Sequence, residues 1–473
     1  MIKNDINILT TPELIKIYID EWEASDERQL MISGEKYYRV ENEVILARKM
    51  YRYEDEQKVE DDTKANHKLA HGFMHEFVDD KVNYLLVKPY TMECKDDTYL
   101  KRVQDILGKR YQHRLVQLGT ETSNKGIAWT YEYIDSKGEK KIMKVPSEQL
   151  IPWWSDNDHE ELDAMIRYYQ IEVYEGKEKK YVTKIEMHYP DGVEYYIKDQ
   201  DGEVILDAEK YLDASGDGVR LPHFIVGNEP GSWDRVPFVP WKNNDFELPD
   251  LQFVKTLIDE YDISRSDVGN LLEEIKQIIY ALRGYGGSSL SDFMRDLAYY
   301  KAIKLDDDGG VDKVEHTIDI DAADKHYQQL QRDIYRFGQA VDKGQDKLGN
   351  SPSGIALKFM YSGLDLKDNS LEDSFKWSFE QQLYFVNKYL EVTKDSVKPS
   401  DQEITITFNR DIAINESQAI TDCQNSKGVI SDETIVANHP WTKNLEEELA
   451  RIKEESSTPD DEMLNLHTHS EEE

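Results

Sequence analysis

Three histidines recur at intervals of four residues near the start of the chain, in the stretch NHKLAHGFMHEF. They are His67, His71 and His75. This spacing places all three on one face of a helix, where imidazole nitrogens could hold a metal ion. However, the HExxH arrangement is absent and no cysteine lies nearby. We therefore interpret the three histidines as structural and predict no metal site.

Two acidic, glycine-containing stretches resemble calcium-binding loops. In DASGDGV, no glutamate follows six residues after either glycine. In DDDGGVDKVE, Asp306, Asp308, Gly309 and Glu315 fit the third, fifth, sixth and twelfth loop positions, but Lys304 puts a cation where the first ligand belongs. We interpret the first stretch as a turn and the second as a hairpin turn.

Residue patterns that support catalysis are missing from the sequence. No GxxxxGK[ST] phosphate-binding loop occurs, so we do not expect ATP hydrolysis. No Ser/His/Asp set and no pair of carboxylates has a spacing that defines an active site. We predict a protein without catalytic activity and without a cofactor.

Composition limits the class of protein. A chain of 473 residues can form two to four domains with a large core, and its two cysteines, Cys94 and Cys423, fit folding in a reducing, intracellular compartment. We find neither a membrane-spanning run nor a signal peptide. The net charge of −37 argues against a conventional nucleic-acid-binding domain, because such domains neutralise phosphates with Lys and Arg. The same charge is compatible with a protein past which DNA slides without being held.

The first half of the chain is expected to combine helices with an antiparallel β region. The first 80 residues are predicted to be helical, and TTPELIKIYIDEWEAS carries a Thr N-cap, a Pro at the first position and a Glu in the first turn. Residues 126–226 alternate apolar and polar side chains, which is typical of strands. Tight turns are predicted at Ser136-Lys137-Gly138, Asp191-Gly192 and Asp201-Gly202.

Two apolar seams follow. One helix of roughly 50 Å is expected from 250 to 282. Its seam residues are Leu251, Val254, Ile258, Tyr261, Val268, Leu272, Ile275, Ile279 and Leu282, with Arg265 in the one polar place. A second helix is expected from 321 to 341, with the seam residues Ala323, Tyr327, Leu330, Ile334, Phe337 and Val341. From periodicity alone, the pair could also be a helical hairpin in an ordinary core.

The stretch DKGQDKLGNSPSG, residues 342–354, separates the second helix from a third. It contains three glycines, one proline and a single large apolar side chain, Leu348. Such a stretch buries too little surface to hold a packed conformation, so we predict a mobile loop. Ser351 and Pro352 then provide the N-cap and first position of the third helix.

The ordered succession of these segments resembles the portal proteins of long-tailed bacteriophages, in the branch typical of phages of Gram-positive bacteria. The resemblance covers nearly the whole chain. The stretches that carry it are NHKLAHGFMHEFVDDKVNYLLVKPYT, PDLQFVKTLIDEYDISRSDVGNLLEEI, YYKAIKL, DAADKHYQQLQRDIYRFGQAV, GNSPSGIALKFMYSGLDLK and ITITFNRDI.

The resemblance implies a predominantly helical α+β subunit that assembles as a cyclic ring, usually of twelve, around an axial DNA channel. Its implied parts are a wing (1–249), a first stem helix (250–282), a clip (283–320), a second stem helix (321–341), a tunnel loop (342–354), a long wing helix with a wing strand (355–412), a helical crown (413–457) and an acidic, disordered tail (458–473).

The resemblance also implies which residues carry the function. The tunnel-loop residues are Lys343, Gln345, Asp346, Lys347, Gly349, Asn350, Ser351, Ser353 and Gly354. The stem-packing residues are Leu251, Val254, Ile258, Tyr261, Arg265, Val268, Leu272, Ile275, Tyr327, Leu330, Ile334 and Phe337. Lys343 and Lys347 could make brief phosphate contacts or could be solvated lysines without a role. We expect Arg265 to pair with a carboxylate or to point into the channel, because an unpaired charge is costly in a dry core.

The implied partners are the terminase large subunit, the major capsid and scaffolding proteins, a head-completion or adaptor protein at the clip, and double-stranded DNA bound without sequence preference. The implied location is the unique capsid vertex of the virion, with assembly in the cytoplasm of the host bacterium. The main alternative is an acidic phage enzyme, for example a Mg²⁺-dependent nuclease. A scaffold or adaptor protein is a third option.

Overall fold

The computed structural model describes residues 10–54, 56–199, 201–211, 220–274, 279–283, 289, 310–314, 320–343, 354–410, 416–442 and 445–457. The chain divides into two compact units. The first comprises residues 1–340 and 364–410, and the second comprises residues 341–363 and 411–473. Within the described residues, no helix combines the length and apolar character that a bilayer-spanning helix needs.

Helices dominate the N-terminal part of the first unit. The elements up to residue 125 are α1 (Thr11–Ala24), α2 (Asp26–Tyr38), α3 (Glu43–Leu46), β1 (Tyr51–Glu54), β2 (Gln57–Glu60), α4 (Phe73–Leu86), β3 (Thr91–Glu93), α5 (Asp97–Leu107) and α6 (Tyr111–Lys125). Helix α1 begins with a capping box between Thr10 and Glu13, which confirms the predicted Thr N-cap and the Glu in the first turn, although Pro12 is the second helical residue and not the first. The prediction that the first 80 residues are helical is wrong for residues 51–60, where β1 and β2 form an antiparallel hairpin. Tyr51, Tyr53 and Val59 favour that extended backbone.

Antiparallel strands follow, as predicted. They include β4 (Ile127–Ile134), β5 (Lys140–Val145), β6 (Leu150–Trp154), β7 (Leu162–Glu175), β8 (Glu178–Tyr189), β9 (Gly192–Lys198), β10 (Val204–Leu206), β11 (Phe224–Val226), β12 (Glu229–Gly231) and β13 (Phe238–Lys242), with the short helices η1 (Ser147–Gln149) and α7 (Ala208–Tyr211). One sheet has the order β10-β9-β8-β7-β6 and another has the order β13-β4-β5. The turns predicted at 136–138 and 201–202 lie between β4 and β5 and between β9 and β10, which confirms them. The turn between β8 and β9 is one residue earlier than predicted, at Pro190 and Asp191, because Gly192 is already the first residue of β9.

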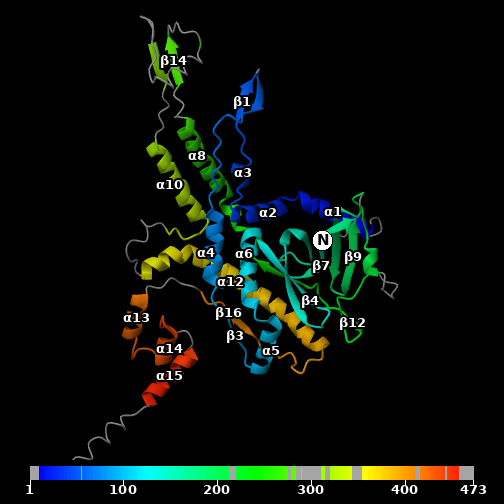
Figure 1. The fold of residues 1–473 in the computed structure, drawn as a ribbon. Coiled ribbons are helices and arrows are strands. Elements are labelled where there is room, and N and C mark those ends of the chain that lie inside the picture. The colour runs from blue at the N-terminus through cyan, green and yellow to red at the C-terminus, as the bar shows by residue number, and fades with distance from the viewer. Residues whose placement is uncertain are drawn as a thin grey trace, which may run out of the picture. The chain divides into compact units, whose positions relative to one another are not determined.

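The remaining elements contain the two seams and the long third helix. They are η2 (Asp250–Phe253), α8 (Lys255–Glu274), β14 (Ile279–Arg283), β15 (Gly310–Val314), α10 (Ile320–Phe337), α12 (Gly354–Val392), β16 (Thr405–Thr407), α13 (Glu416–Asn425), α14 (Asp432–Ala437) and α15 (Leu445–Ser457). Figure 1 shows α8 and α10 side by side, with β14 beyond their far end.

The prediction of one helix through residue 282 is wrong, because α8 ends at Glu274 and residues 279–283 form a strand. Strand β14 pairs with β15 in an antiparallel ladder. The run IIYALR is apolar and β-branched at its start, so it fits a strand as well as a helical seam. Cross-strand pairing with residues 310–314, which are distant in sequence, decides between the two.

Two apolar clusters form the core of the first unit. One cluster gathers residues from α4, α5, α6, α8, α10 and α12, including Leu251, Ile258, Ile334 and Phe375. The other joins α1 to the strands β4 and β6–β9. Gly126 connects α6 to β4 with φ of +84°, and a Cβ built there would lie 1.9 Å from the carbonyl oxygen of Glu247. The helix-to-sheet joint therefore requires glycine.

Candidate functional site: the α8–α10 pair and its buried base

Helices α8 and α10 pack through the predicted seam over most of its length. The buried seam residues are Leu251, Val254, Ile258, Tyr261, Tyr327, Leu330 and Ile334. The Tyr327 hydroxyl donates a hydrogen bond to the carbonyl oxygen of Ser264 at 3.0 Å, which fixes the register of the two helices. His326 of α10 also lies 3.8 Å from Glu260 of α8. The pair is therefore held by apolar burial together with specific polar contacts.

The ends of the seam are less buried than the sequence predicts. Leu272 is 49% exposed and Phe337 is 56% exposed, and Val268 is half-buried. Ile275 lies outside the described residues. A seam residue left in solvent gives little stability to the helix pair itself, so these two apolar side chains are available to another surface.

Arg265 is exposed, and its guanidinium lies over the ring of Tyr327 at 4.8 Å. Among the described residues it makes no ion pair. The contact therefore spans the two helices as a cation–π interaction, and the arginine keeps access to solvent. This agrees with the expectation that Arg265 avoids a dry core, whereas its pairing with a carboxylate stays a prediction.

A second face of α8 binds an extended segment that precedes α4. The backbone N–H groups of His67, Leu69 and His71 donate to side chains of α8, namely Asn270, Ser266 and Asp262. Because these donors are used up by side chains of α8, the segment cannot form helical hydrogen bonds. The prediction that the three histidines share a helical face is therefore wrong, since α4 begins only at Phe73.

The histidines instead make separate contacts with carboxylates. The Nδ1 atom of His71 lies 2.6 Å from an oxygen of Asp262, which is buried. His67 pairs with Glu273 at 2.8 Å, and His75 lies 3.5 Å from Asp79. Two of these contacts fasten the segment to α8, which is a structural role.

The base of the α8–α10 pair contains a buried cluster of charged and polar side chains. Lys81 on α4 donates to Asn243 at 2.5 Å and lies 3.3 Å from Asp250, the first residue of η2. Lys367 on α12 pairs with Asp250 at 3.0 Å and also donates to the carbonyl oxygen of Gly338 at 3.2 Å. Gly338 directly follows α10. One lysine of α12 thus joins the start of the first helix of the pair to the end of the second.

The protonation of this cluster follows from burial and from its neighbours. Burial acts to raise the pKa of Asp250, but Lys367 and Lys81 outweigh it, so the pKa lies below the ordinary value and the carboxylate stays charged. Burial lowers the pKa of Lys81, although Asp250 opposes this shift. We refer to Lys81, Asn243, Asp250, Lys367 and Asp368 as the ionic base.

Asp368 differs from Asp250 because neither of its oxygens has a hydrogen-bond partner among the described residues. Its side chain is fully buried. Burial raises its pKa to about 7, despite the opposing charges of Lys81, Lys367 and Arg410. At neutral pH this carboxyl group is therefore partly protonated, unlike an ordinary aspartate.

Only two of the predicted tunnel-loop residues lie among the described residues. Lys343 has neither helical nor strand conformation, and Gly354 is the first residue of α12. Gln345, Asp346, Lys347, Gly349, Asn350, Ser351 and Ser353 lie outside the described residues. The described chain confirms the order of the segments around them, because α10 precedes the stretch and α12 follows it.

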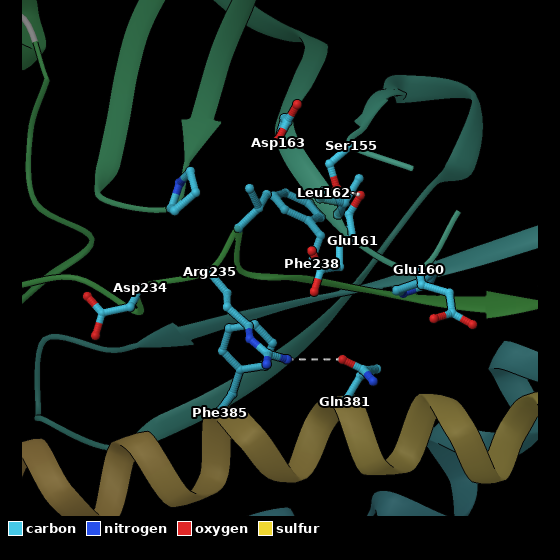
Figure 2. A pocket seen from close by; sticks show the side chains of 13 residues that line it. Ser155, Glu160, Glu161, Leu162, Asp163, Asp234, Arg235, Phe238, Gln381 and Phe385 are labelled. Atoms are coloured by element: carbon cyan, nitrogen blue, oxygen red, sulfur yellow. Dashed lines mark hydrogen bonds between the residues drawn. The ribbon is translucent and has the colours of Figure 1, made fainter. Parts of the chain in front are cut away.

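An acid-lined cavity of about 450 Å³ lies beside the middle of α12 (Figure 2). Its lining includes Glu160, Glu161, Asp163 and Asp234, and Arg235 donates to Gln381 of α12 at 3.2 Å. Within the described part of the chain, no group of three or more His, Cys, Asp or Glu side chains is arranged to hold a metal ion. The cavity gives no specific support to a metal-dependent enzyme.

Comparison with known proteins decides the family. The model of the family described as "Phage portal protein, SPP1 Gp6-like" matches residues 15–461. The chain belongs to this phage portal family. The portal protein of Bacillus phage SPP1 is 33% identical over 428 residues, which are 90% of this chain and 83% of that protein. The portal protein of Clostridium phage phiCD119 is 30% identical over 435 residues, which are 89% of this chain and 91% of that protein.

The family assignment confirms the resemblance and the portal function that the sequence predicts. Neither named relative is a nuclease. A solved structure described as "Neck of native GTA particle computed with C12 symmetry" gives a TM-score of 0.38 at 11% identity, with 78% of this chain and 89% of that chain covered. A structural similarity this weak does not define the fold.

The ionic base is the feature that sequence analysis missed. Its members lie on α4, η2, α12 and the loop after β13, so no local spacing connects them. The only local signal is the pair Lys367-Asp368 in a helix whose buried face is mostly apolar but also contains Ser378 and Gln382. Such a pair is equally common on solvated faces.

Proposed function

We propose that the chain assembles into a closed ring, of about twelve subunits as the resemblance implies, around an axial channel that conducts double-stranded DNA. The ring occupies one vertex of the phage capsid, and its role is structural, without catalysis. The proposal is supported by the membership in the portal family over residues 15–461 and by the order of the described elements. The charge of −37 also suits a channel, because a basic lining would bind phosphates and stall the duplex.

Each part of the chain has a proposed place in this ring. Helices α8 and α10 form the stem, and the segment between them, with β14 and β15, forms the clip. The stretch 342–354 is the tunnel loop, and α13–α15 form the crown. The elements before η2, together with most of α12 and β16, form the wing.

The observation that carries this proposal is the construction of the α8–α10 pair. The pair is fastened at its base by the ionic base, packed through a narrow seam, and left with exposed apolar residues, Leu272 and Phe337, at the seam ends. A helix pair inside an ordinary core would bury those residues within the subunit. A helix pair in a ring has neighbours on two sides, so part of its surface is exposed in the single subunit and is covered by another subunit in the ring.

The proposed partners follow from what the chain lacks and from its position. Without a phosphate-binding loop, the chain cannot drive packaging itself, so the energy comes from the terminase large subunit. Major capsid and scaffolding proteins surround the wing, and a head-completion protein attaches at the clip. DNA passes without sequence-specific contacts, and Lys343 and Lys347 touch phosphates only briefly.

The assembly is tested by negative-stain microscopy and native mass measurement of the purified protein. We expect rings with a central hole, and the mass gives the number of subunits. Compact monomers under all salt conditions, or cleavage of DNA that requires Mg²⁺, would contradict the proposal.

The tunnel loop is tested in procapsids by replacing Gly349 with Val, alone and together with Gly354→Val. Both changes reduce backbone freedom in the loop and add bulk. We expect normal ring yield but less nuclease-protected DNA per procapsid than with the wild-type chain. The change Glu178→Val puts the same side chain at an exposed position of strand β8, where a β-branched residue is tolerated, and as a control it should leave packaging unchanged. Full packaging by the double variant would remove the stretch from the channel, and loss of rings would make it a structural joint.

A further inference from the structure

The outward face of α10 carries a row of cations that have no ion-pair partner among the described residues. Lys325, Gln329, Arg332 and Arg336 follow one another at steps of four, three and four residues, so they form a stripe on the side opposite the seam. The three cations are exposed. Within the described part of the chain, none of them forms an ion pair or a hydrogen bond. Three unpaired cations on one helix face are notable in a chain of net charge −37.

An acidic surface lies on another face of α8. Residues 40–62, which we call the arm, contain α3 and the β1–β2 hairpin and carry eight carboxylates but only four basic side chains. Glu41, Glu56 and Asp62 are exposed, and they make no ion pair or side-chain hydrogen bond to another described residue. The arm is therefore an acidic surface on which, among the described residues, three carboxylates are not held in an ion pair.

Most basic side chains of the arm are already engaged, which leaves this acidity uncompensated. Arg48 pairs with Asp267 of α8, Lys49 pairs with Glu60 at 2.7 Å, and Arg52 lies 2.9 Å from Glu54. The three carboxylates outside ion pairs therefore need cations from elsewhere if they are to be paired.

The arm also exposes apolar and aromatic side chains. Val44 is 40% exposed, Leu46 is 42% exposed and Tyr53 is 77% exposed. Two of these lie on the short helix α3, and the third lies on a hairpin of only two strands. Such a hairpin is marginally stable in water without further packing. The long aliphatic stems of Lys and Arg can cover apolar surface of this kind while their charged ends reach carboxylates.

Helix α8 separates the two surfaces. It contacts α10 through its seam, including Ile258 and Tyr261. On another face, Asp262 accepts a hydrogen bond from Asn42 of the arm, and Ser266 and Asn270 bind the backbone of the segment that follows the arm. Figure 1 likewise shows β1 and α3 on the α8 side of the pair. Every subunit thus presents a basic stripe on one side of α8 and an acidic, partly apolar arm on another.

We propose that the α10 stripe of one subunit docks against the arm of a second copy of this chain. The stripe and the arm are different surfaces, so the contact is heterologous, and repeating it around an axis closes a ring. The inference rests on the proposed ring and names the surfaces that form its stem-level interface. Charge complementarity and the exposed apolar residues of the arm favour a second copy over DNA, because DNA would leave the acidic arm uncovered.

The test is a reciprocal charge reversal in the full chain. The stripe variant carries Lys325→Glu, Arg332→Glu and Arg336→Glu, and the arm variant carries Glu41→Lys, Glu56→Lys and Asp62→Lys. Each should lower the yield of rings at least about tenfold at low salt, because repulsion repeats at every interface. The chain that carries all six changes should recover most of the yield. A matched control, Lys109→Glu with Lys137→Glu and Lys177→Glu, reverses three exposed cations far from α10 and should leave the yield unchanged.

The outcomes separate this inference from the ring itself. Wild-type rings together with normal rings from both triple variants would overturn the inference but leave the ring standing. If such a stripe variant also packaged less DNA, the stripe would face the channel instead of a neighbour. Loss of rings in both variants without recovery in the combined chain would likewise overturn the pairing of these two surfaces. Absence of rings from the wild-type chain would overturn both proposals.

Discussion

Replacing Asp368 with Asn should make the stability of the first unit less dependent on pH. The wild-type carboxyl group is fully buried, has no hydrogen-bond partner among the described residues, and has a pKa raised from 3.8 to about 7 by burial. Between these two pH values, the folded chain binds a proton that the unfolded chain releases. The wild-type protein therefore loses stability as the pH rises through this window. Asparagine has the same shape and does not titrate.

The size of the effect follows from the pKa. The full loss amounts to on the order of 4 kcal/mol above pH 7, at 1.36 kcal/mol for each pH unit between the two pKa values. Between pH 5 and pH 8, the loss is about 2.5 kcal/mol. For a unit of about 390 residues, with an unfolding entropy of roughly 2.1 cal/mol/K per residue, this corresponds to ~3 °C in the melting temperature.

The assay compares melting temperatures of the two chains at pH 5 and pH 8, at one protein concentration and ionic strength. A constant cost of the substitution cancels in this comparison, so only the titration of Asp368 remains. The melting temperature of Asp368→Asn relative to wild type should rise by ~3 °C from pH 5 to pH 8. Asp373→Asn, an exposed carboxylate on the same helix, is the matched control and should show no such change.

A flat or reversed difference would refute the reasoning. In that case Asp368 would be ionised in the folded chain at both pH values, and attraction to Lys81, Lys367 and Arg410 would outweigh burial. The ionic base would then contain two ionised carboxylates, Asp250 and Asp368.

Three further substitutions test other parts of the structure. Lys140→Met should lower the free energy of unfolding by about 3–5 kcal/mol, measured as a lower melting temperature. The reason is that Glu132 loses its cation in a fully buried site. A loss below about 1 kcal/mol would contradict this. Gly126→Ala should cost at least about 2 kcal/mol and reduce soluble yield, since the added Cβ meets a backbone carbonyl at positive φ, and normal yield would show that the joint can relax. Arg265→Leu should change the free energy of unfolding of the subunit by no more than ~1 kcal/mol but should lower the salt resistance of rings. Unchanged salt resistance would exclude a role between subunits.

Periodicity predicted the elements whose stability is local. The seam spacing of Tyr327, Leu330 and Ile334 is confirmed as the packed face of α10, and the turns at Gly138 and Gly202 are confirmed where they were predicted. In these segments the apolar pattern and the turn chemistry favour the same conformation, so the local signal is sufficient.

Periodicity failed where a distant partner decides the local conformation. The four-residue spacing of His67 and His71 indicates a helix, but side chains of α8 bind the backbone N–H groups of this segment. Likewise, residues 279–283 fit the continuing seam, but pairing with β15 makes them a strand. Neither α8 nor β15 is adjacent in sequence to the segment that it reshapes, so a single chain without further information cannot reveal the contact.

The ionic base suggests a reason why the α8–α10 pair is anchored by charged side chains beside η2 and Gly338. An apolar base of similar volume would often be as stable as a buried ionic cluster, or more so. Apolar contacts, however, allow helices to slide, whereas Lys367 must reach both the carboxylate of Asp250 and the carbonyl oxygen of Gly338. These two contacts hold η2, which precedes α8, the end of α10 and α12 in one arrangement. The proposed tunnel loop lies between α10 and α12 in the sequence, so the contact of Lys367 with Gly338 fixes the end of α10 against α12 whatever conformation the proposed loop adopts.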